Sequence, residues 1–363
     1  RTDDAKEALD VGASNSRNTS KVYKLLGGIA LEEGDAELAV EYFKKASRQD
    51  KDDVQASYML AYSHVNNGDF EAARKELDLN RSDSEWYARA LLLEAVLLGK
   101  DTDAASALVD EAQSVDFEND DLEILLDDYS QVLQRVDDLS DDESSPEYVD
   151  VILSYGALLA GYEDVVIDRL SGYVEDDTEY WDLYLYLGKA YYMNDDLEKA
   201  AEYLSSASAI NPSDPSPAWN LARIYGELGS DEEMENNYVR AIALAAEEDR
   251  PVIRKEFIEM LMDRERYVAV DEQLLLLAQE DPDNAPEYIL MRVRSYISRN
   301  MYGEANELLS TLEADTLSDD LRAEHSWAKG SILFGQGKRD DAQVWAEEAV
   351  SLEETNPEYH LLL

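Results

Sequence analysis

The sequence predicts an all-α protein, a solenoid built from about nine stacked helical hairpins. Three observations lead to this prediction. The chain has 363 residues, more than one compact core usually holds, so several domains or a repeat array are expected. It contains only 16 Gly and 8 Pro, which favours long helices over many short strands. Finally, the sequence resembles itself at an internal period of about 34 residues.

The internal period is clearest when three segments are aligned, namely 20–53, 181–214 and 215–250. Each has an apolar residue at position 7, a small residue at position 8, a turn near position 15 and Ala at position 27. Apolar positions recur three and four residues apart, which predicts an amphipathic helix on each side of the turn. Gly188 and Ala200 are small where two such helices must approach closely.

Seven positions of one 34-residue window resemble the tetratricopeptide repeat: Leu187, Gly188, Tyr191, Ala200, Leu204, Ala207 and Pro212. The resemblance implies two antiparallel helices per repeat, stacked into a right-handed superhelix whose first helices line a concave groove. One hairpin cannot bury its apolar face alone, so neighbouring hairpins must stack. The same phase recurs, with fewer matching positions, in six further segments: 54–85, 86–118, 147–180, 251–285, 286–322 and 323–356.

The repeat phase is interrupted before residue 147. Residues 120–136 are typical of one extra helix, and residues 137–146, DDLSDDESSP, are typical of an exposed acidic linker. We therefore expect two sub-arrays, 1–136 and 147–363. By the same phase the first begins inside a second helix and the last ends at position 7 of a further repeat, which indicates a slice of a longer array. The alternative is that both ends are helical caps, which natural solenoids need.

The charge of the chain is strongly acidic. It has 82 Asp and Glu against 32 Lys and Arg, a net charge of -50. Such a surface repels nucleic acid and anionic membranes, so no nucleic-acid partner is expected. High-salt adaptation and an ordinary acidic surface both explain this charge. No run approaches 18 apolar residues, so no membrane insertion is expected in this segment, and the cytoplasm, the periplasm and export all remain open as compartments.

The residues that usually carry catalysis or bind metals are sparse. There is no Cys, and the three histidines, His64, His325 and His360, lack a partner at HExxH spacing. The acidic linker lacks the glycine and the terminal glutamate of an EF-hand loop. We therefore expect no enzyme activity, no cofactor and no metal.

The resemblance implies that the groove is lined by positions 2, 5, 9, 12 and 13 of each first helix. These positions, with Lys255 one turn before position 9 of its copy, hold basic and aromatic residues: Tyr148, Tyr155, Lys189, Tyr192, Trp219, Arg223, Lys255, Arg294, Trp327 and Phe334. Arg and aromatic residues contribute most at interfaces, and cations suit an acidic peptide. We expect a basic and aromatic groove inside an acidic shell. The alternative is that the basic residues only balance neighbouring acids and that the tryptophans pack between repeats.

The leading functional hypothesis is a non-enzymatic scaffold that binds a protein or peptide, an acidic one among the candidates, in the concave groove. A second hypothesis is a periplasmic or envelope component of a polysaccharide secretion or assembly system, in which the groove aromatics stack on sugars. A third is the regulatory array of a larger enzyme. The sequence does not indicate the oligomeric state or the identity of the partner.

Overall fold

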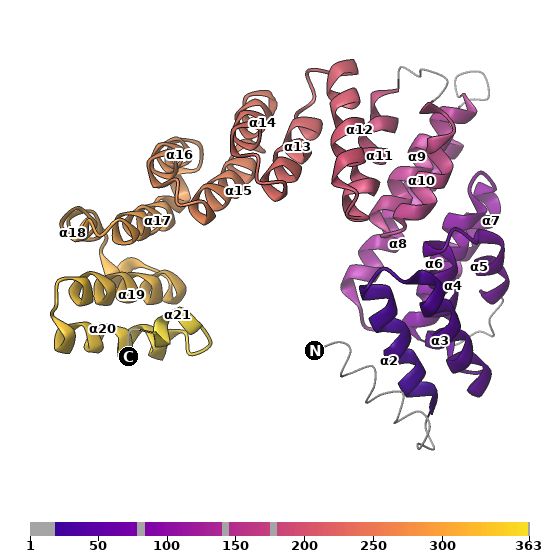
Figure 1. The fold of residues 1–363 in the computed structure, drawn as a ribbon, viewed down its shortest axis with the longest axis horizontal. Coiled ribbons are helices and arrows are strands. Elements are labelled where there is room, and N and C mark those ends of the chain that lie inside the picture. Colours follow the sequence, from indigo (N-terminus) through magenta and orange to yellow (C-terminus); the bar gives the residue numbers. More distant parts are fainter. Residues whose placement is uncertain (1–18, 78–83, 140–144, 175–179, 362–363) are drawn as a thin grey trace. The chain divides into compact units, whose positions relative to one another are not determined.

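The computed structural model describes residues 19–77, 84–139, 145–174 and 180–361. These residues form helices joined by turns and contain no strand. The packing of the chain divides it into two compact units, an N-terminal unit of residues 1–212 and a C-terminal unit of residues 213–363 (Figure 1). The all-α prediction is confirmed, and the described helices pair into nine hairpins and two helices without a hairpin partner, α8 and α21.

The N-terminal unit contains the helices drawn from indigo to magenta in Figure 1. Its helices are α2 (Thr19–Glu32), α3 (Ala36–Gln49), α4 (Val54–Asn66), α5 (Phe70–Glu76), α6 (Glu85–Leu98), α7 (Thr102–Gln113), α8 (Asp120–Asp137), α9 (Pro146–Leu159), α10 (Glu163–Ser171), α11 (Trp181–Met193) and α12 (Leu197–Ile210). Helix α8 packs on both α7 and α9, so it separates three hairpins from the two that follow it.

The C-terminal unit contains four further hairpins and a short last helix. Its helices are α13 (Pro215–Glu227), α14 (Asp231–Leu244), α15 (Arg250–Asp263), α16 (Tyr267–Glu280), α17 (Ala285–Ser298), α18 (Tyr302–Leu309), α19 (Asp319–Gly335), α20 (Arg339–Leu352) and α21 (Pro357–His360), with 3₁₀ turns η2 (Pro282–Asn284) and η3 (Ala314–Thr316). Within the described residues of both units, no helix is both long enough and apolar enough to cross a membrane.

Each hairpin turn contains a residue with positive φ, and in four of them an aspartate follows that caps the second helix. Gly34 and Gly68 have φ of 74° and 72°, a conformation that favours glycine. The next residues, Asp35 and Asp69, accept a hydrogen bond from a backbone N–H of the second helix. Asp195, with φ of 60°, takes the left-handed place in the α11–α12 turn. Part of the acidic composition therefore serves to start helices.

The two helices of a hairpin approach closely at small residues, as predicted. A Cβ added at Gly188 in α11 would lie 2.6 Å from Cγ of Leu204 and 3.2 Å from the backbone oxygen of Ala200, both in α12. Ala200 and Leu204 have no exposed surface. The close contact of α11 with α12 therefore requires glycine at this position.

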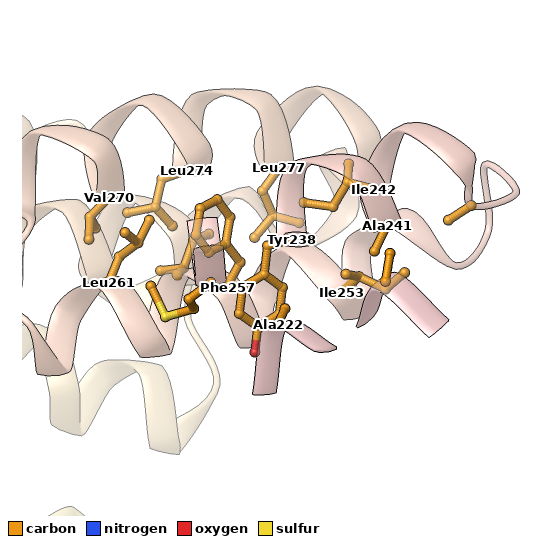
Figure 2. Close-up of a cluster of buried hydrophobic side chains, with 14 of the residues drawn as sticks. Ala222, Tyr238, Ala241, Ile242, Ile253, Phe257, Leu261, Val270, Leu274 and Leu277 are labelled. Atoms are coloured by element: carbon orange, nitrogen blue, oxygen red, sulfur yellow. The ribbon is translucent and has the colours of Figure 1, made fainter. Parts of the chain in front are cut away.

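The core of the C-terminal unit shows how successive hairpins share one apolar layer. Figure 2 shows the rings of Tyr238 and Phe257 side by side. Ala222 of α13 and the leucines of α16, Leu274 and Leu277, belong to the same cluster. The ring centroids of Tyr238 and Phe257 are 4.8 Å apart and the rings are stacked. Tyr238 belongs to α14 and Phe257 to α15, so this stack joins two hairpins and buries surface that a single hairpin would expose.

The predicted break in the array falls partly outside the described residues. Helix α8 covers the residues where the extra helix was expected. Of the acidic linker 137–146, residues 140–144 are not described. The packing places the boundary between units after Pro212 and groups α8–α12 with the preceding helices, so a division at the linker stays a prediction. Residues 1–18 and 362–363 also lie outside the described part, and the slice of a longer array stays a prediction too.

A polar link joins several hairpin turns to the second helix of the preceding hairpin. In each case the residue just before the left-handed position donates to a carboxylate near the start of that helix. The links are Asn194 to Asp164 (3.0 Å), Arg264 to Asp231 (2.8 Å) and Arg299 to Asp271 (3.0 Å). Because a repeat contacts only its neighbours, such links add to the interface term that holds the stack together.

Candidate functional site

The N-terminal unit has an exposed tyrosine and aliphatic surface on two adjacent first helices, α9 and α11. We call it the tyrosine face: Tyr148, Tyr155 and Leu159 of α9 with Tyr186 and Met193 of α11. Its members are spaced by seven and four residues along α9 and by seven along α11, which places them on one side of each helix. The rings of Tyr155 and Tyr186 lie 5.7 Å apart. Tyr155 and Leu159 are each 40% exposed and Met193 is 52% exposed, so this face is only partly covered by the chain.

Charged groups border the tyrosine face at one end. Arg135 of α8 donates a hydrogen bond of 3.2 Å from Nη2 to the hydroxyl of Tyr148. Burial, reinforced by the negative charge of Asp182, raises the pKa of Tyr186 to about 12. Burial also raises the pKa of Asp182, and the nearby charge of Arg135 opposes this. A cation and a partly buried acid therefore lie beside the rings.

Two further predicted groove residues also lie on α11. Lys189 is half-buried and lies between Tyr186 and Met193 in the sequence, on the same side of the helix. Tyr192 is half-buried near the C-terminal end of the helix. The structure thus brings together the predicted residues Tyr148, Tyr155 and Lys189, with Tyr192 at the border of the same surface.

In the C-terminal unit the predicted groove arginines are engaged with carboxylates of the next hairpin. The guanidinium of Arg223 donates hydrogen bonds of 2.7 and 2.6 Å to the two oxygens of Glu256 and lies 4.6 Å from the ring centroid of Trp219. Glu256 also accepts from Trp219 (3.1 Å) and from the hydroxyl of Tyr238 (2.7 Å). Burial acts to raise the pKa of Glu256, but these hydrogen bonds outweigh it and lower the pKa. We call this group the first clamp.

A second clamp repeats the same chemistry two hairpins later. Arg294 donates to Glu324 with both Nε (3.1 Å) and Nη2 (2.9 Å), and to Glu358 with Nη1 (2.6 Å). Its guanidinium carbon lies 4.3 Å from the ring centroid of Trp327. The hydroxyl of Tyr359 donates to Glu324 at 3.2 Å. As in the first clamp, an arginine that packs on a tryptophan and a tyrosine hydroxyl both bind one glutamate.

The remaining two predicted residues differ from each other. The Nζ of Lys255 lies 5.3 Å from the ring centroid of Tyr288 and 3.9 Å from a carboxylate oxygen of Asp281. Phe334 is 50% exposed near the end of α19, and the guanidinium of Arg339 lies 5.8 Å from its ring. Lys255 therefore has an acidic and an aromatic neighbour, while Phe334 keeps half of its ring in solvent.

These contacts are those that the alternative to a basic and aromatic groove describes, with basic residues balanced by neighbouring acids. The positive charges of Arg223 and Arg294 are balanced by carboxylates within the chain, and Trp219 and Trp327 pack on those arginines. Whether these side chains bind a partner stays a prediction. Leu159, Tyr186 and Met193 were not predicted, although the helical spacing from Tyr155 and Lys189 would have indicated them.

Among the described residues, no group of three or more His, Asp or Glu side chains is arranged to hold a metal ion. His64 and His325 lie on different hairpins, and burial lowers the pKa of each imidazole. What the described surfaces offer is apolar, aromatic and charged contact area, which is suited to binding.

Two segments of the chain match models of the tetratricopeptide repeat: residues 30–85 and residues 167–215. The first covers α3, α4 and α5, and the second covers α11 and α12 with parts of the flanking segments. The second contains the 34-residue window with seven matching positions. No curated protein matches the chain.

Among solved structures, the chain is similar to yeast Tom70, with 14% identity over 99% of this chain and 90% of that one and a TM-score of 0.35. It is also similar to a chain of the APC/C heterotetramer Cut9–Hcn1, with 13% identity over 95% of this chain and 75% of that one and a TM-score of 0.38.

Proposed function

Because this chain belongs to the tetratricopeptide repeat family, whose arrays serve as protein-interaction scaffolds, we propose that a protein or peptide partner binds the tyrosine face of α9 and α11. One observation carries the proposal: Tyr155, Leu159 and Met193 are exposed together on two adjacent first helices. Contiguous exposed apolar surface with a polar border is typical of interaction sites. Tyrosine adds contact area with little loss of side-chain entropy.

The border of the tyrosine face favours a partner that brings both apolar and acidic groups. Arg135 bonds to a phenol, not to a carboxylate, among the residues that the structure describes. An acidic side chain of the partner would meet this cation beside an apolar surface, where a charge-assisted hydrogen bond is stronger than in bulk water. The two clamps differ, because a partner there would have to replace carboxylates that already bind the arginines.

The test compares proteins captured by the full chain with those captured by the double variant Tyr155→Ala/Met193→Ala. Truncating a central interface residue costs about 2 kcal/mol or more, which corresponds to about thirtyfold in affinity. We expect at least one protein to be lost with the variant and to bind the purified wild-type chain directly in calorimetry. Unchanged affinity of every such protein for the variant would contradict the proposal.

A matched control is available on α16, where Val268 and Leu275 are also exposed apolar side chains. The variant Val268→Ala/Leu275→Ala removes similar apolar area outside the tyrosine face and should leave capture unchanged. Reversing Arg223 and Arg294 to Glu is a poorer test of binding. It would place like charges inside both clamps and would lower stability at the same time.

The proposed scaffold function is non-enzymatic, which is general for proteins with this repeat fold. The envelope or secretion alternative and the regulatory-array alternative would use the same face in a larger protein. Flanking sequence distinguishes them: a signal peptide with a transport domain supports the first, and a catalytic motif supports the second. If the full chain captures a saccharide that the Tyr155→Ala/Met193→Ala variant does not, and both capture the same proteins, the envelope or secretion alternative is favoured.

A further inference from the structure

The turn between α9 and α10 packs against a helix about one hundred residues earlier in the chain. Tyr162, in this turn, is only 3% exposed although it lies in a loop. Its ring centroid is 6.2 Å from that of Tyr62 in α4, and its hydroxyl group lies near that of Tyr58 in the same helix. Burial raises the pKa of Tyr162. A loop tyrosine this deeply covered indicates a specific receiving surface.

The receiving surface is an aromatic box formed by α4 and α6. The rings of Tyr58 and Tyr62 are stacked 6.3 Å apart, and Trp86 of α6 lies 5.6 Å from Tyr58. The guanidinium of Arg89 lies over the ring of Trp86, 5.9 Å from its centroid. The box thus offers ring faces, tyrosine hydroxyl groups and a nearby cation, and the side chain of Tyr162 packs into it.

Other contacts attach the same hairpin to α6 and to its following turn. Arg169 of α10 donates a hydrogen bond of 2.9 Å from Nη2 to the backbone oxygen of Val96, in the last turn of α6. A cation is favoured at this negative end of the helix dipole. Lys100, just after α6, forms an ion pair of 2.9 Å with Asp150 of α9. Both helices of the hairpin are therefore anchored.

The first and fifth hairpins border a common cleft as a result. Glu33 from the α2–α3 turn, Asn66 from the end of α4, Asp164 from α10 and Asp195 from the α11–α12 turn line an open cleft of about 580 Å³. An extended stack would keep such turns apart, because each repeat would contact only its neighbours. Here the chain returns on itself around α10.

Tyr58 and Tyr62 occupy positions 5 and 9 of the repeat that begins at residue 54, which are among the positions that the repeat resemblance assigns to the groove. We propose that the inner surface of α4 and α6 is a docking surface whose occupant is the chain's own α9–α10 turn, held by Tyr162. The turn is an intramolecular ligand that closes this stretch of groove. A partner reaches Tyr58 and Tyr62 only when the turn leaves. This inference does not depend on the tyrosine face.

A distance measurement between two spin labels tests the closure. The chain has no cysteine, so Asn67→Cys at the end of α4 and Asp168→Cys in α10 provide two unique labelling sites, both exposed. We expect one narrow distance distribution for the full chain. Replacing Tyr162 by Ala should shift the distribution to longer and broader distances, because the box loses the ring that fills it. Tyr162→Phe keeps the ring and should keep the narrow distribution.

The matched control is Tyr203→Ala, which removes a half-buried ring of the same unit that stacks on Tyr191 and lies outside the box. The distance should stay unchanged in this variant. A narrow, unshifted distribution in Tyr162→Ala with native helix content overturns the proposal, as does equal opening in Tyr203→Ala. If Tyr162→Ala loses helix content by circular dichroism, Tyr162→Leu is measured by the same criterion. It keeps buried volume but removes the ring and the hydroxyl.

Discussion

The carboxylate of Glu256 accepts hydrogen bonds from Nε and Nη2 of Arg223 across the interface between two hairpins. The residues lie on α13 and α15, the first helices of consecutive repeats. The second clamp repeats the relationship between Arg294 of α17 and Glu324 of α19. In both, bidentate geometry fixes the approach of two helices as well as compensating charge. The clamps therefore act as interface bonds of the solenoid.

Replacing Glu256 by Gln should lower the stability of the chain. The variant keeps the shape of the side chain but loses the negative charge that accepts hydrogen bonds from Arg223, Tyr238 and Trp219. Because both charged side chains are partly exposed, we expect a loss of about 1 to 2 kcal/mol in urea unfolding. Glu259→Gln, an exposed change on the same helix, should alter stability by less than about 0.5 kcal/mol. Equal effects of the two changes would argue against the clamp.

Replacing Gly188 by Ala should destabilise the N-terminal unit. The added methyl group would meet Leu204 at 2.6 Å, and overpacking of this kind costs about 1 to 3 kcal/mol. Gly28 is a matched control inside α2, where an added Cβ meets nothing within 4 Å. Gly28→Ala should raise stability by about 0.5 to 1 kcal/mol, through helix propensity alone. Thermal unfolding of both variants checks the sign of each change.

Replacing Tyr129 by Phe should raise stability at neutral pH. The ring of Tyr129 is fully buried, and its hydroxyl has no hydrogen-bond partner among the described residues. Removing an unsatisfied hydroxyl should gain about 1 kcal/mol. Tyr87→Phe is the control, because the hydroxyl of Tyr87 donates to Glu111 at 2.9 Å and its loss should lower stability. A lower stability of the Tyr129 variant would show that its hydroxyl is satisfied.

The same substitution should change the response to alkali. Burial raises the pKa of Tyr129 to about 12, against the opposing charge of Arg169. A raised folded-state pKa gives stability that is complete below the unfolded value of about 10 and is lost as pH rises through about 12. The free energy of unfolding, measured between about pH 10 and pH 12, should therefore decrease less steeply with pH for Tyr129→Phe than for the wild-type chain. Tyr173 and Tyr186, whose pKa values are also raised to about 12, should keep part of the slope.

The hairpins could be predicted from the sequence because they depend on local patterns. A small residue opposite a large one, as at Gly188 and Leu204, repeats with the period of the fold and is visible in one dimension. The same holds for Gly34 with Asp35, where a left-handed turn and a helix cap follow each other. Such signals need no knowledge of how the hairpins curve.

The candidate site could be predicted only in part. The position of a residue within its repeat predicted both Tyr155 and Arg223 as groove residues. It could not show that Arg223 is paired with Glu256, which lies 33 residues later on another helix. The docking of Tyr162 on Tyr62 spans one hundred residues and depends on how the chain brings α10 back to α4. A repeat period predicts which residues of one hairpin contact each other. It does not predict which hairpins that are distant in the sequence pack together.

The links between hairpin turns and preceding helices have a consequence for how such an array changes in evolution. Arg264 and Arg299 hold equivalent places, and the start of α14 carries two acids, Asp231 and Glu235, each paired with an arginine of the next turn. If the α15–α16 hairpin were deleted, Arg299 would face α14 and still find a carboxylate. The charges of these turn links would therefore match at the new junction, whereas Arg223 would lose Glu256, its partner on α15.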